Sequence, residues 1–181
     1  MPLHNNTQQT HTQKIIYPGT FDPVTNGHVS MIQRASKMFP HIVIAIADNH
    51  KKAPLFSLAE RQQLAEAATA EFRHQCNIEV EVFSGLLGDF LQRHDCYVIL
   101  RGLRTAQDFD YEIQMSHINH KLNHAIETVC LMAREPHTSI SSSWVKELAK
   151  LGAELHHFVP DIVAQALRTK LAKSNRNGDA W

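Results

Sequence analysis

Five short apolar runs, separated by amphipathic stretches, constrain the fold of this chain more than any other feature of its sequence. We expect strands at residues 14–17, 42–47, 78–83, 96–100 and 128–133. The second run, IVIAIA, is apolar throughout, which is typical of a strand buried on both faces of a parallel sheet. Apolar residues at helical spacing predict helices at 28–39, 57–72, 86–93, 108–122, 141–151 and 160–172.

This alternation of strands and helices also predicts how the chain is arranged in space. Parallel strands need crossover connections, and the helices in those connections cover both faces of the sheet. We therefore expect an α/β protein, a single Rossmann-like doubly wound domain with a five-stranded parallel sheet. The domain should cover residues 14–172, between a disordered N-terminal extension at 1–13 and a flexible C-terminal tail at 173–181.

Local signals mark several of the expected helix ends. Ser57 is followed three residues later by Glu60, which is the spacing of a capping box. Gly152 follows the fifth helix, where a left-handed residue often ends a helix. Pro160 stands in the first turn of the last helix, where its missing N–H costs no hydrogen bond.

Charge and cysteine content argue against several classes of protein. Eighteen Lys and Arg residues balance eighteen Asp and Glu residues, so a general nucleic-acid or membrane-surface binder is not expected. Three cysteines without a C-x-x-C pair argue against a disulfide framework or a structural zinc site and favour a cytoplasmic protein. The thirteen histidines are scattered, and no pair of them specifies a metal site. The chain has no run of eighteen apolar residues, so we expect no membrane span.

The stretch YPGTFDPVTNGH, residues 17–28, joins the first expected strand to the first expected helix. Ligands of open α/β sheets bind beyond the carboxyl ends of the strands, and a helix that begins there offers N–H groups and a positive dipole end to an anion. Gly19 lets the backbone approach a ligand, Thr20 adds a hydroxyl donor, and Gly27 leaves room beside His28 in the first helical turn. Because no dinucleotide or P-loop fingerprint occurs, the stretch predicts an anion site of another kind.

A second motif, ISSS at residues 140–143, offers three hydroxyls and free N–H groups at a helix start, which suits phosphate groups. One of its serines is expected to cap the helix. Together, TNGH at 25–28 and ISSS at 140–143 resemble the two signatures of the nucleotidylyltransferase superfamily. The closer resemblance is to the bacterial phosphopantetheine adenylyltransferases. It rests also on the Lys52–Pro54–Phe56 loop and on LRGLRTAQDFDYEIQMSHIN at 100–119, and it covers roughly residues 15–172.

The resemblance implies that the chain transfers the adenylyl group of ATP to 4′-phosphopantetheine, giving dephospho-coenzyme A and pyrophosphate by direct in-line displacement without a covalent intermediate. A phosphate monoester is mostly dianionic at neutral pH, so the reaction needs positioning and charge neutralisation, and no general base. Mg²⁺ is expected to accompany ATP and to be held mostly by phosphates and water. The resemblance also implies a homo-oligomer, a hexamer, with no nucleic-acid or membrane partner.

The resemblance assigns roles to individual residues. His28, Lys52 and Thr20 are the expected catalytic residues, with His28 donating to the α-phosphate and Lys52 binding the attacking phosphate. The expected 4′-phosphopantetheine site consists of Thr20, Lys52, Leu87 and Arg101, the last at the carboxyl end of the fourth strand. The expected ATP site consists of Thr20, Phe21, His28, Gly102, Leu103, Arg104, Glu112, His137, Thr138, Ser139, Ile140, Ser141, Ser142 and Ser143.

Other interpretations stay open for several of these residues. Leu87 fits a hydrophobic core as well as a substrate arm, and Asp108 and Asp110 fit a helix start favoured by the dipole. His137 and Ser139 depart from the family, which often carries an aromatic residue and Phe there. The main alternative activity is that of another nucleotidylyltransferase, acting on a nicotinamide mononucleotide or an alcohol phosphate, although such relatives tend to carry His in place of Thr25. A non-enzymatic nucleotide sensor with the same fold is the second alternative.

Overall fold

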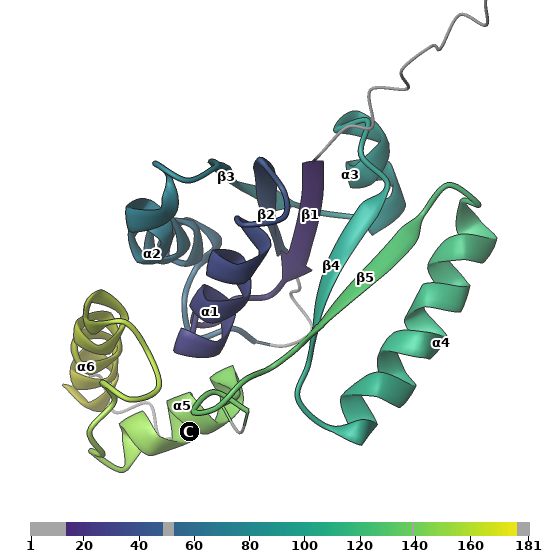
Figure 1. The fold of residues 1–181 in the computed structure, drawn as a ribbon. Helices are drawn as coiled ribbons and strands as arrows, with labels where there is room; N and C mark the ends of the chain where they lie inside the picture. Colours follow the sequence, from purple (N-terminus) through teal and green to yellow (C-terminus); the bar gives the residue numbers. More distant parts are fainter. Residues whose placement is uncertain (1–13, 49–52, 139, 177–181) are drawn as a thin grey trace, which may run out of the picture.

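The computed structural model describes residues 14–48, 53–138 and 140–176, which form an open sheet flanked by helices (Figure 1). The five strands are parallel and lie in the order β3-β2-β1-β4-β5. Their bounds are β1 Lys14–Gly19, β2 His41–Ala47, β3 Asn77–Phe83, β4 Val98–Leu103 and β5 Glu127–Met132. The strand order reverses between β1 and β4, so the predicted doubly wound, five-stranded parallel sheet is confirmed.

Helices form the connections of this sheet and extend beyond its last strand. Their bounds are α1 Asn26–Ala35, α2 Leu58–Thr69, α3 Leu87–Arg93, α4 Ala106–Leu122, α5 Ser142–Lys150 and α6 Asp161–Arg176. A 3₁₀ turn at Ala70–Phe72 extends α2. Among the described residues, no helix is both long enough and apolar enough to span a membrane.

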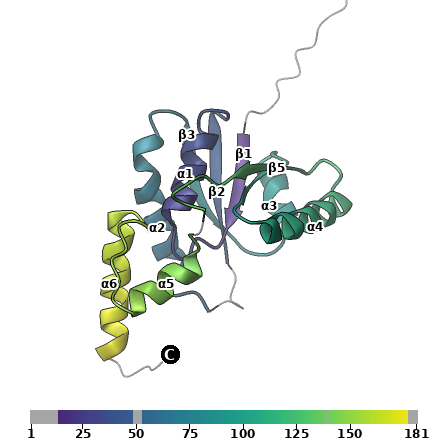
Figure 2. The same cartoon turned by 60° about the horizontal axis from the view of Figure 1, so that its bottom comes forward.

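The sheet has an apolar core on each face, which explains the continuous run IVIAIA. Ile42, Ile44 and Ile46 face the larger core, to which α1, α2, α5 and α6 contribute, whereas Val43 and Ala45 face the core beneath α3. Figure 2 shows α1, α2 and α6 on one side of the strands and α3 and α4 on the other. A strand covered on both faces has no position for a polar side chain.

The local helix signals proved informative. Ser57 caps α2 through the predicted reciprocal bonds with Glu60, and Gly152 after α5 has a φ of 75°.

The boundaries of other elements were less accurate. β4 continues to Leu103 because its pairing with β5 continues to that residue, so Arg101 lies within the strand. α6 extends to Arg176, four residues beyond the expected end, because residues 173–176 contain neither Pro nor Gly to stop it.

Candidate active site

Two adjoining cavities open at the carboxyl ends of β1 and β4, where the strand order reverses. The first has a volume of about 340 Å³ and the second of about 260 Å³. Pro18, Gly19, Arg101 and Glu112 line both of them. This is the position at which open α/β sheets bind ligands, and the two cavities share Arg101 and Glu112 in their common wall.

The first cavity gathers most of the residues expected to bind ATP. Nine of them line it: Phe21, His28, Gly102, Arg104, Glu112, His137, Ile140, Ser141 and Ser142. Six further lining residues were not among the expected ligand-binding residues, namely Tyr17, Pro18, Thr25, Met31, Asp108 and Ala133. Residues more than a hundred positions apart in the sequence therefore meet at one cavity.

The second cavity gathers the described residues expected to bind 4′-phosphopantetheine. Thr20, Leu87 and Arg101 line it, beside Ala47, Ile99 and Thr128 of the sheet. The opposite wall comes from α4, which contributes Tyr111, Glu112, Met115, Ser116 and Asn119. Apart from Glu112, none of these α4 residues was predicted, because a helix that lines a cavity has the same periodicity as one that packs on a core.

His28 is oriented by the start of its own helix. Thr25 caps α1, and its backbone N–H donates to His28 Nδ1 at 3.0 Å, while the His28 N–H donates back to the Thr25 hydroxyl at 3.4 Å. A nitrogen that accepts the Thr25 N–H carries no proton, so the neutral ring carries its proton on Nε2. His28 can therefore donate one hydrogen bond into the first cavity.

The charge of His28 follows from its surroundings. Burial, and secondarily the nearby Arg104 guanidinium, lower the pKa of His28 from 6.5 to about 4. The ring is therefore neutral at physiological pH, which agrees with Nδ1 acting as an acceptor. Aromatic neighbours hold the ring in place, with Phe21 at 5.0 Å between ring centroids and Tyr17 at 6.3 Å. Burial also raises the pKa of Tyr17 to about 12, so its phenol stays neutral.

Phe21 completes this cluster with an unusual backbone. Its φ is 49°, in the left-handed region, and only 2% of the residue is exposed. The ring of Phe21 packs against Gly19, where an added Cβ would lie 2.9 Å from the ring. Gly19 is therefore required by protein packing as well as by any close approach of a ligand. At Gly27 an added Cβ would meet its neighbours at 3.5 Å or more, so the protein itself would accommodate alanine there.

Arg101 and Glu112 form an ion pair in the wall between the cavities. The guanidinium donates from Nε and Nη2 to the two carboxylate oxygens, and from Nη1 to the Pro18 carbonyl at 2.9 Å. Burial opposes the charge of Arg101, but the bidentate contact with Glu112 outweighs it and raises the pKa of the guanidinium. These bonds use three of the five Arg101 N–H groups, so two remain for a ligand.

A second arginine lies at the start of α4. Arg104 binds Asp108 and donates from Nη1 to the Ile140 carbonyl at 3.0 Å, which connects the ISSS segment to α4. Burial opposes ionisation of Asp108, but the bonds from Arg104 and Thr105 lower the pKa of its carboxyl group. Asp108 also forms a capping box with Thr105, which confirms the interpretation of this aspartate as a helix-start residue.

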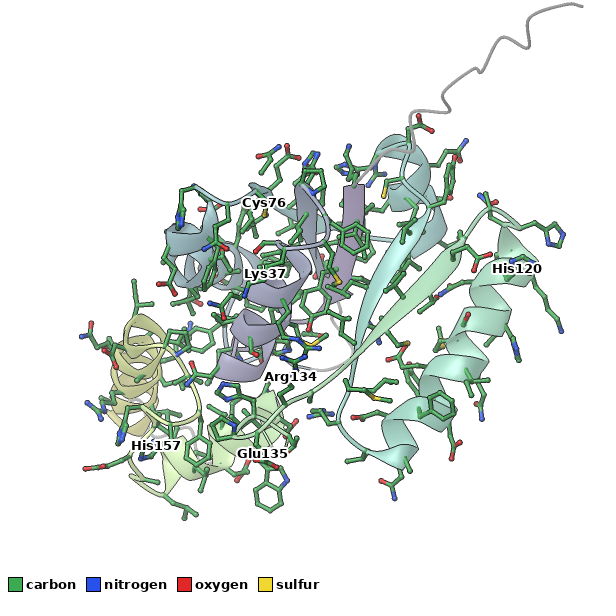
Figure 3. The ribbon with its side chains drawn as sticks, viewed as in Figure 1. Lys37, Cys76, His120, Arg134, Glu135 and His157 are labelled. Atoms are coloured by element: carbon green, nitrogen blue, oxygen red, sulfur yellow. The ribbon has the colours of Figure 1, made fainter. Side chains whose placement is uncertain are left out.

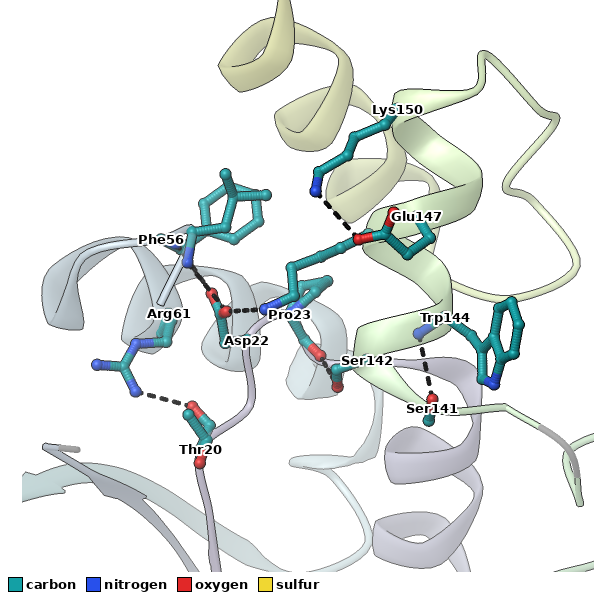
Figure 4. A network of polar contacts seen from close by, with 12 residues as sticks. Thr20, Asp22, Pro23, Phe56, Arg61, Ser141, Ser142, Trp144, Glu147 and Lys150 are labelled. Carbon is teal, nitrogen blue, oxygen red and sulfur yellow. Dashed lines mark hydrogen bonds and ion pairs between the residues drawn. The ribbon is translucent and has the colours of Figure 1, made fainter. Parts of the chain in front are cut away.

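Asp22 connects three segments around the first cavity (Figure 4). Its carboxylate accepts the N–H groups of Leu55 and Phe56 at 3.0 and 2.9 Å, and it pairs with Lys146 of α5 at 2.7 Å. Only 4% of Asp22 is exposed. The loop between β1 and α1 is therefore bound both to the segment before α2 and to α5. The sequence interpretation assigned no role to Asp22 or Lys146.

Arg61 of α2 also contacts the loop after β1. It is fully buried, and its Nη1 donates to the Thr20 carbonyl at 2.9 Å, at the end of β1 (Figure 4). The same Nη1 donates to the Ala47 carbonyl at 3.0 Å, at the end of β2. The hydrogen bonds between strands stop where the strands end, so the carbonyls there lack a backbone partner. The Arg61 guanidinium donates hydrogen bonds to them instead. No signal in the sequence distinguishes Arg61 from the exposed charges of an amphipathic helix.

The three serines of ISSS have different environments. Ser141 caps α5 by accepting the Trp144 N–H, which confirms that one serine caps the helix. Ser142 donates from its hydroxyl to the Pro23 carbonyl at 2.8 Å, so this hydroxyl holds the first loop. Ser143 lies outside the first cavity and lines a separate hollow beside Trp144 and Lys146.

The remaining predicted residues have no observed place in these cavities. Leu103 is buried, and Thr138 donates to Glu135 from the loop before α5. Lys52 and Ser139 lie outside the described residues, so their roles stay predictions.

Comparisons with known proteins agree with this fold. A family described as cytidylyltransferase-like matches residues 16–148, a range that includes both cavities and the starts of α1 and α5. The chain is also similar to the crystal structure of a candidate nicotinate-nucleotide adenylyltransferase from Vibrio parahaemolyticus, with a TM-score of 0.62 and 12% sequence identity. That similarity covers 92% of this chain and 96% of the other, and at this identity it establishes the fold alone.

Proposed function

Since the chain belongs to the cytidylyltransferase-like family, we propose that it transfers the adenylyl group of ATP to 4′-phosphopantetheine. The observation that carries the proposal is the convergence of two helix starts on the first cavity, next to a second cavity. Thr25 and His28 bring the start of α1 to the first cavity, and Ser141 and Ser142 bring the start of α5. Two positive dipole ends that meet at one cavity suit a polyphosphate.

In the proposed reaction a phosphate oxygen of 4′-phosphopantetheine attacks the α-phosphorus of ATP from the second cavity. The bond between the α-phosphorus and its oxygen to the β-phosphorus breaks, and pyrophosphate leaves from the start of α5. The Nε2–H of His28 donates to the α-phosphate oxygens, where negative charge develops in the transition state. Arg101, in the shared wall, keeps two N–H groups for the attacking phosphate. The residues only position groups and stabilise charge, so no covalent intermediate forms.

The cavity residues fit a Mg²⁺ ion that arrives with ATP. Asp108 and Glu112 supply the carboxylates among the described residues of the first cavity, and each is already bound by an arginine. The phosphates and water would therefore hold the ion, as expected for Mg²⁺. When bound, it would supply positive charge that partly neutralises the phosphates.

The substrate assignment is tested by a pyrophosphate-release assay on the full chain. ATP is combined in turn with 4′-phosphopantetheine, nicotinate mononucleotide, nicotinamide mononucleotide, glycerol phosphate and phosphocholine. Nicotinate mononucleotide is included because of the Vibrio parahaemolyticus neighbour. We expect the highest kcat/KM with 4′-phosphopantetheine. A higher value with any of the other acceptors would replace our assignment, and no turnover with any of them would favour a nucleotide sensor.

The assignment of the two cavities is tested separately by calorimetric titration. Leu87→Ala removes apolar surface from the second cavity, and His137→Ala shortens a side chain in the first. We expect Leu87→Ala to weaken binding of 4′-phosphopantetheine about ten-fold with little change for ATP, since a lost apolar contact costs about 1–2 kcal/mol. His137→Ala should weaken binding of ATP with little change for 4′-phosphopantetheine, because it removes a side chain from the wall of the first cavity. The opposite pattern would mean that ATP binds in the second cavity and 4′-phosphopantetheine in the first. Lys52→Ala should behave like Leu87→Ala.

A further inference from the structure

A second group of chemically active side chains lies away from both cavities, toward the amino ends of the strands. Glu79 and Glu81 are two residues apart on β3, so they project from the same face of the sheet. His94, the residue that ends α3, reaches the same point. One ligand atom from each of these three side chains lies within 4.8 Å of the others.

The separations resemble those between ligands of one small cation. His94 Nε2 lies 3.2 Å from Glu81 Oε2, and the two atoms share a hydrogen bond when no ion is bound. Zn²⁺ binds nitrogen and carboxylate oxygen at about 2.0–2.2 Å in tetrahedral geometry, which separates neighbouring ligand atoms by roughly 3.3–3.5 Å. Small movements of the Glu79 side chain, which is 42% exposed, would bring all three atoms to that arrangement.

His41, the first residue of β2, provides an independent observation at the same place. Its Nε2 lies 3.1 Å from Glu79 Oε1, yet this buried nitrogen has no hydrogen-bond partner among the described residues. A short contact without a hydrogen bond means that the nitrogen and the oxygen are not directed at each other. Two ligands of one cation lie close together without pointing at each other, because each directs a lone pair at the ion. His41 is thus available as a further donor beside Glu79.

The charges around the group also favour a cation. Two carboxylates meet here, and no ion pair between them and a Lys or Arg is observed among the described residues. Asn77 donates to Glu79 Oε1 at 3.1 Å and so orients that carboxylate, as the outer partners of metal ligands do.

We propose that Glu79, Glu81 and His94 bind a divalent transition-metal ion of the zinc class, with His41 beside them. Imidazole combined with carboxylate suits Zn²⁺, whereas Mg²⁺ prefers an all-oxygen octahedral shell. The ion would join β3 to the end of α3, the helix whose first residue, Leu87, lines the second cavity. The sequence alone specifies no metal site, because His94 comes next to β3 only through the fold. This inference does not depend on the proposed activity.

The proposal is tested by titrating the full, tag-free chain with Zn²⁺ against a chromophoric zinc chelator, without ATP or Mg²⁺. We expect one Zn²⁺ per chain. Glu81→Gln and His94→Gln should each weaken binding at least ten-fold, because losing even an outer partner typically costs about 10–100-fold. Glu81 is 44% exposed at its side chain, so Glu81→Gln should fold normally even if His94→Gln does not.

A matched control tests whether histidines elsewhere in the chain account for the Zn²⁺ binding. His120 and His124 lie with their rings 5.0 Å apart on and after α4, beyond the opposite edge of the sheet (Figure 3). The double variant His120→Gln, His124→Gln should retain the wild-type affinity. Co²⁺ should give the visible absorption of a four-coordinate ion in the wild type and lose it in Glu81→Gln. An affinity unchanged in Glu81→Gln, a loss in the control, or a wild type that takes up no Zn²⁺ would each overturn the proposal.

Discussion

At the scale of single residues, the orientation of His28 determines what it can do. Its Nδ1 is occupied by the Thr25 N–H, so only Nε2–H is available to a ligand. We predict that His28→Ala lowers kcat by roughly 10²–10³ and changes ATP affinity little, because the donor acts on charge that develops in the transition state. Steady-state kinetics and calorimetry measure the two quantities.

The matched control for His28 is His157→Ala, at an exposed histidine outside both cavities (Figure 3). It should leave kcat and ATP affinity unchanged. A His28→Ala enzyme within a few-fold of wild-type turnover would remove His28 from the reaction. A variant that loses ATP binding to the same extent as turnover would make it a ground-state ligand.

The lowered pKa of His28 also predicts how stability depends on pH. Above about pH 6.5 the ring is neutral in both the folded and the unfolded chain, so it imposes no penalty on folding. Between 6.5 and about 4 the unfolded chain binds a proton that the folded protein excludes, so the free energy of unfolding falls as pH falls. Urea denaturation at about pH 7 and about pH 4.5 should show a smaller loss in His28→Gln than in the wild type. Equal losses would mean that His28 is protonated as easily in the folded chain as in the unfolded chain.

At the scale of elements, the loop after β1 is held by contacts with α2 and α5. We predict that Asp22→Asn lowers the free energy of unfolding by about 2–3 kcal/mol, somewhat below the value for a fully buried pair because Lys146 is 25% exposed at its side chain. It should also lower kcat, since the same contacts position the starts of α1 and α5. Denaturant titration and the transferase assay measure the two effects.

Glu147→Gln is the control for Asp22→Asn. It removes the exposed ion pair with Lys150 on the same helix, three residues apart, and should change stability by less than about 1 kcal/mol. Adding Lys146→Met to Asp22→Asn should restore part of the lost stability, because the unpaired ammonium is then gone. If Asp22→Asn is as mild as Glu147→Gln, the loop does not depend on this ion pair.

The elements also show which parts of the site can be predicted from sequence. The capping box of Ser57 and Glu60 and the cap at Ser141 involve residues three apart, so the sequence shows both partners together. The contact of Asp22 with Lys146 joins residues 124 positions apart, and no local pattern indicates it. The cavity wall formed by Met115 and Asn119 was missed for the related reason that periodicity does not show what a helix faces. The motifs thus pointed to residues that line the two cavities, while the contacts that support these residues needed the fold.

At the scale of the whole molecule, few residues of the 17-residue helix α4 are buried against the rest of the chain. Glu112 is its one buried residue. Several large apolar side chains of α4 and the edge strand β5 are exposed: Phe109, Tyr111, Ile113, Ile118, Leu122 and Met132. An apolar surface of this kind on a single chain is typical of an interface. We infer that α4 and β5 contact other copies of the chain, in keeping with the expected homohexamer.

This inference gives a prediction for assembly. Light scattering at micromolar concentration should give a mass that is a multiple of 20.5 kDa. Ile118→Glu should raise the dissociation constant at least about ten-fold, since burying an unpaired carboxylate in an apolar contact costs more than 1.4 kcal/mol. The matched control is Ile162→Glu on α6, because Ile162 is 46% exposed against 49% for Ile118 and lies far from α4. A monomer of 20.5 kDa in the wild type would refute the assembly, and equal effects of the two variants would move the interface away from α4.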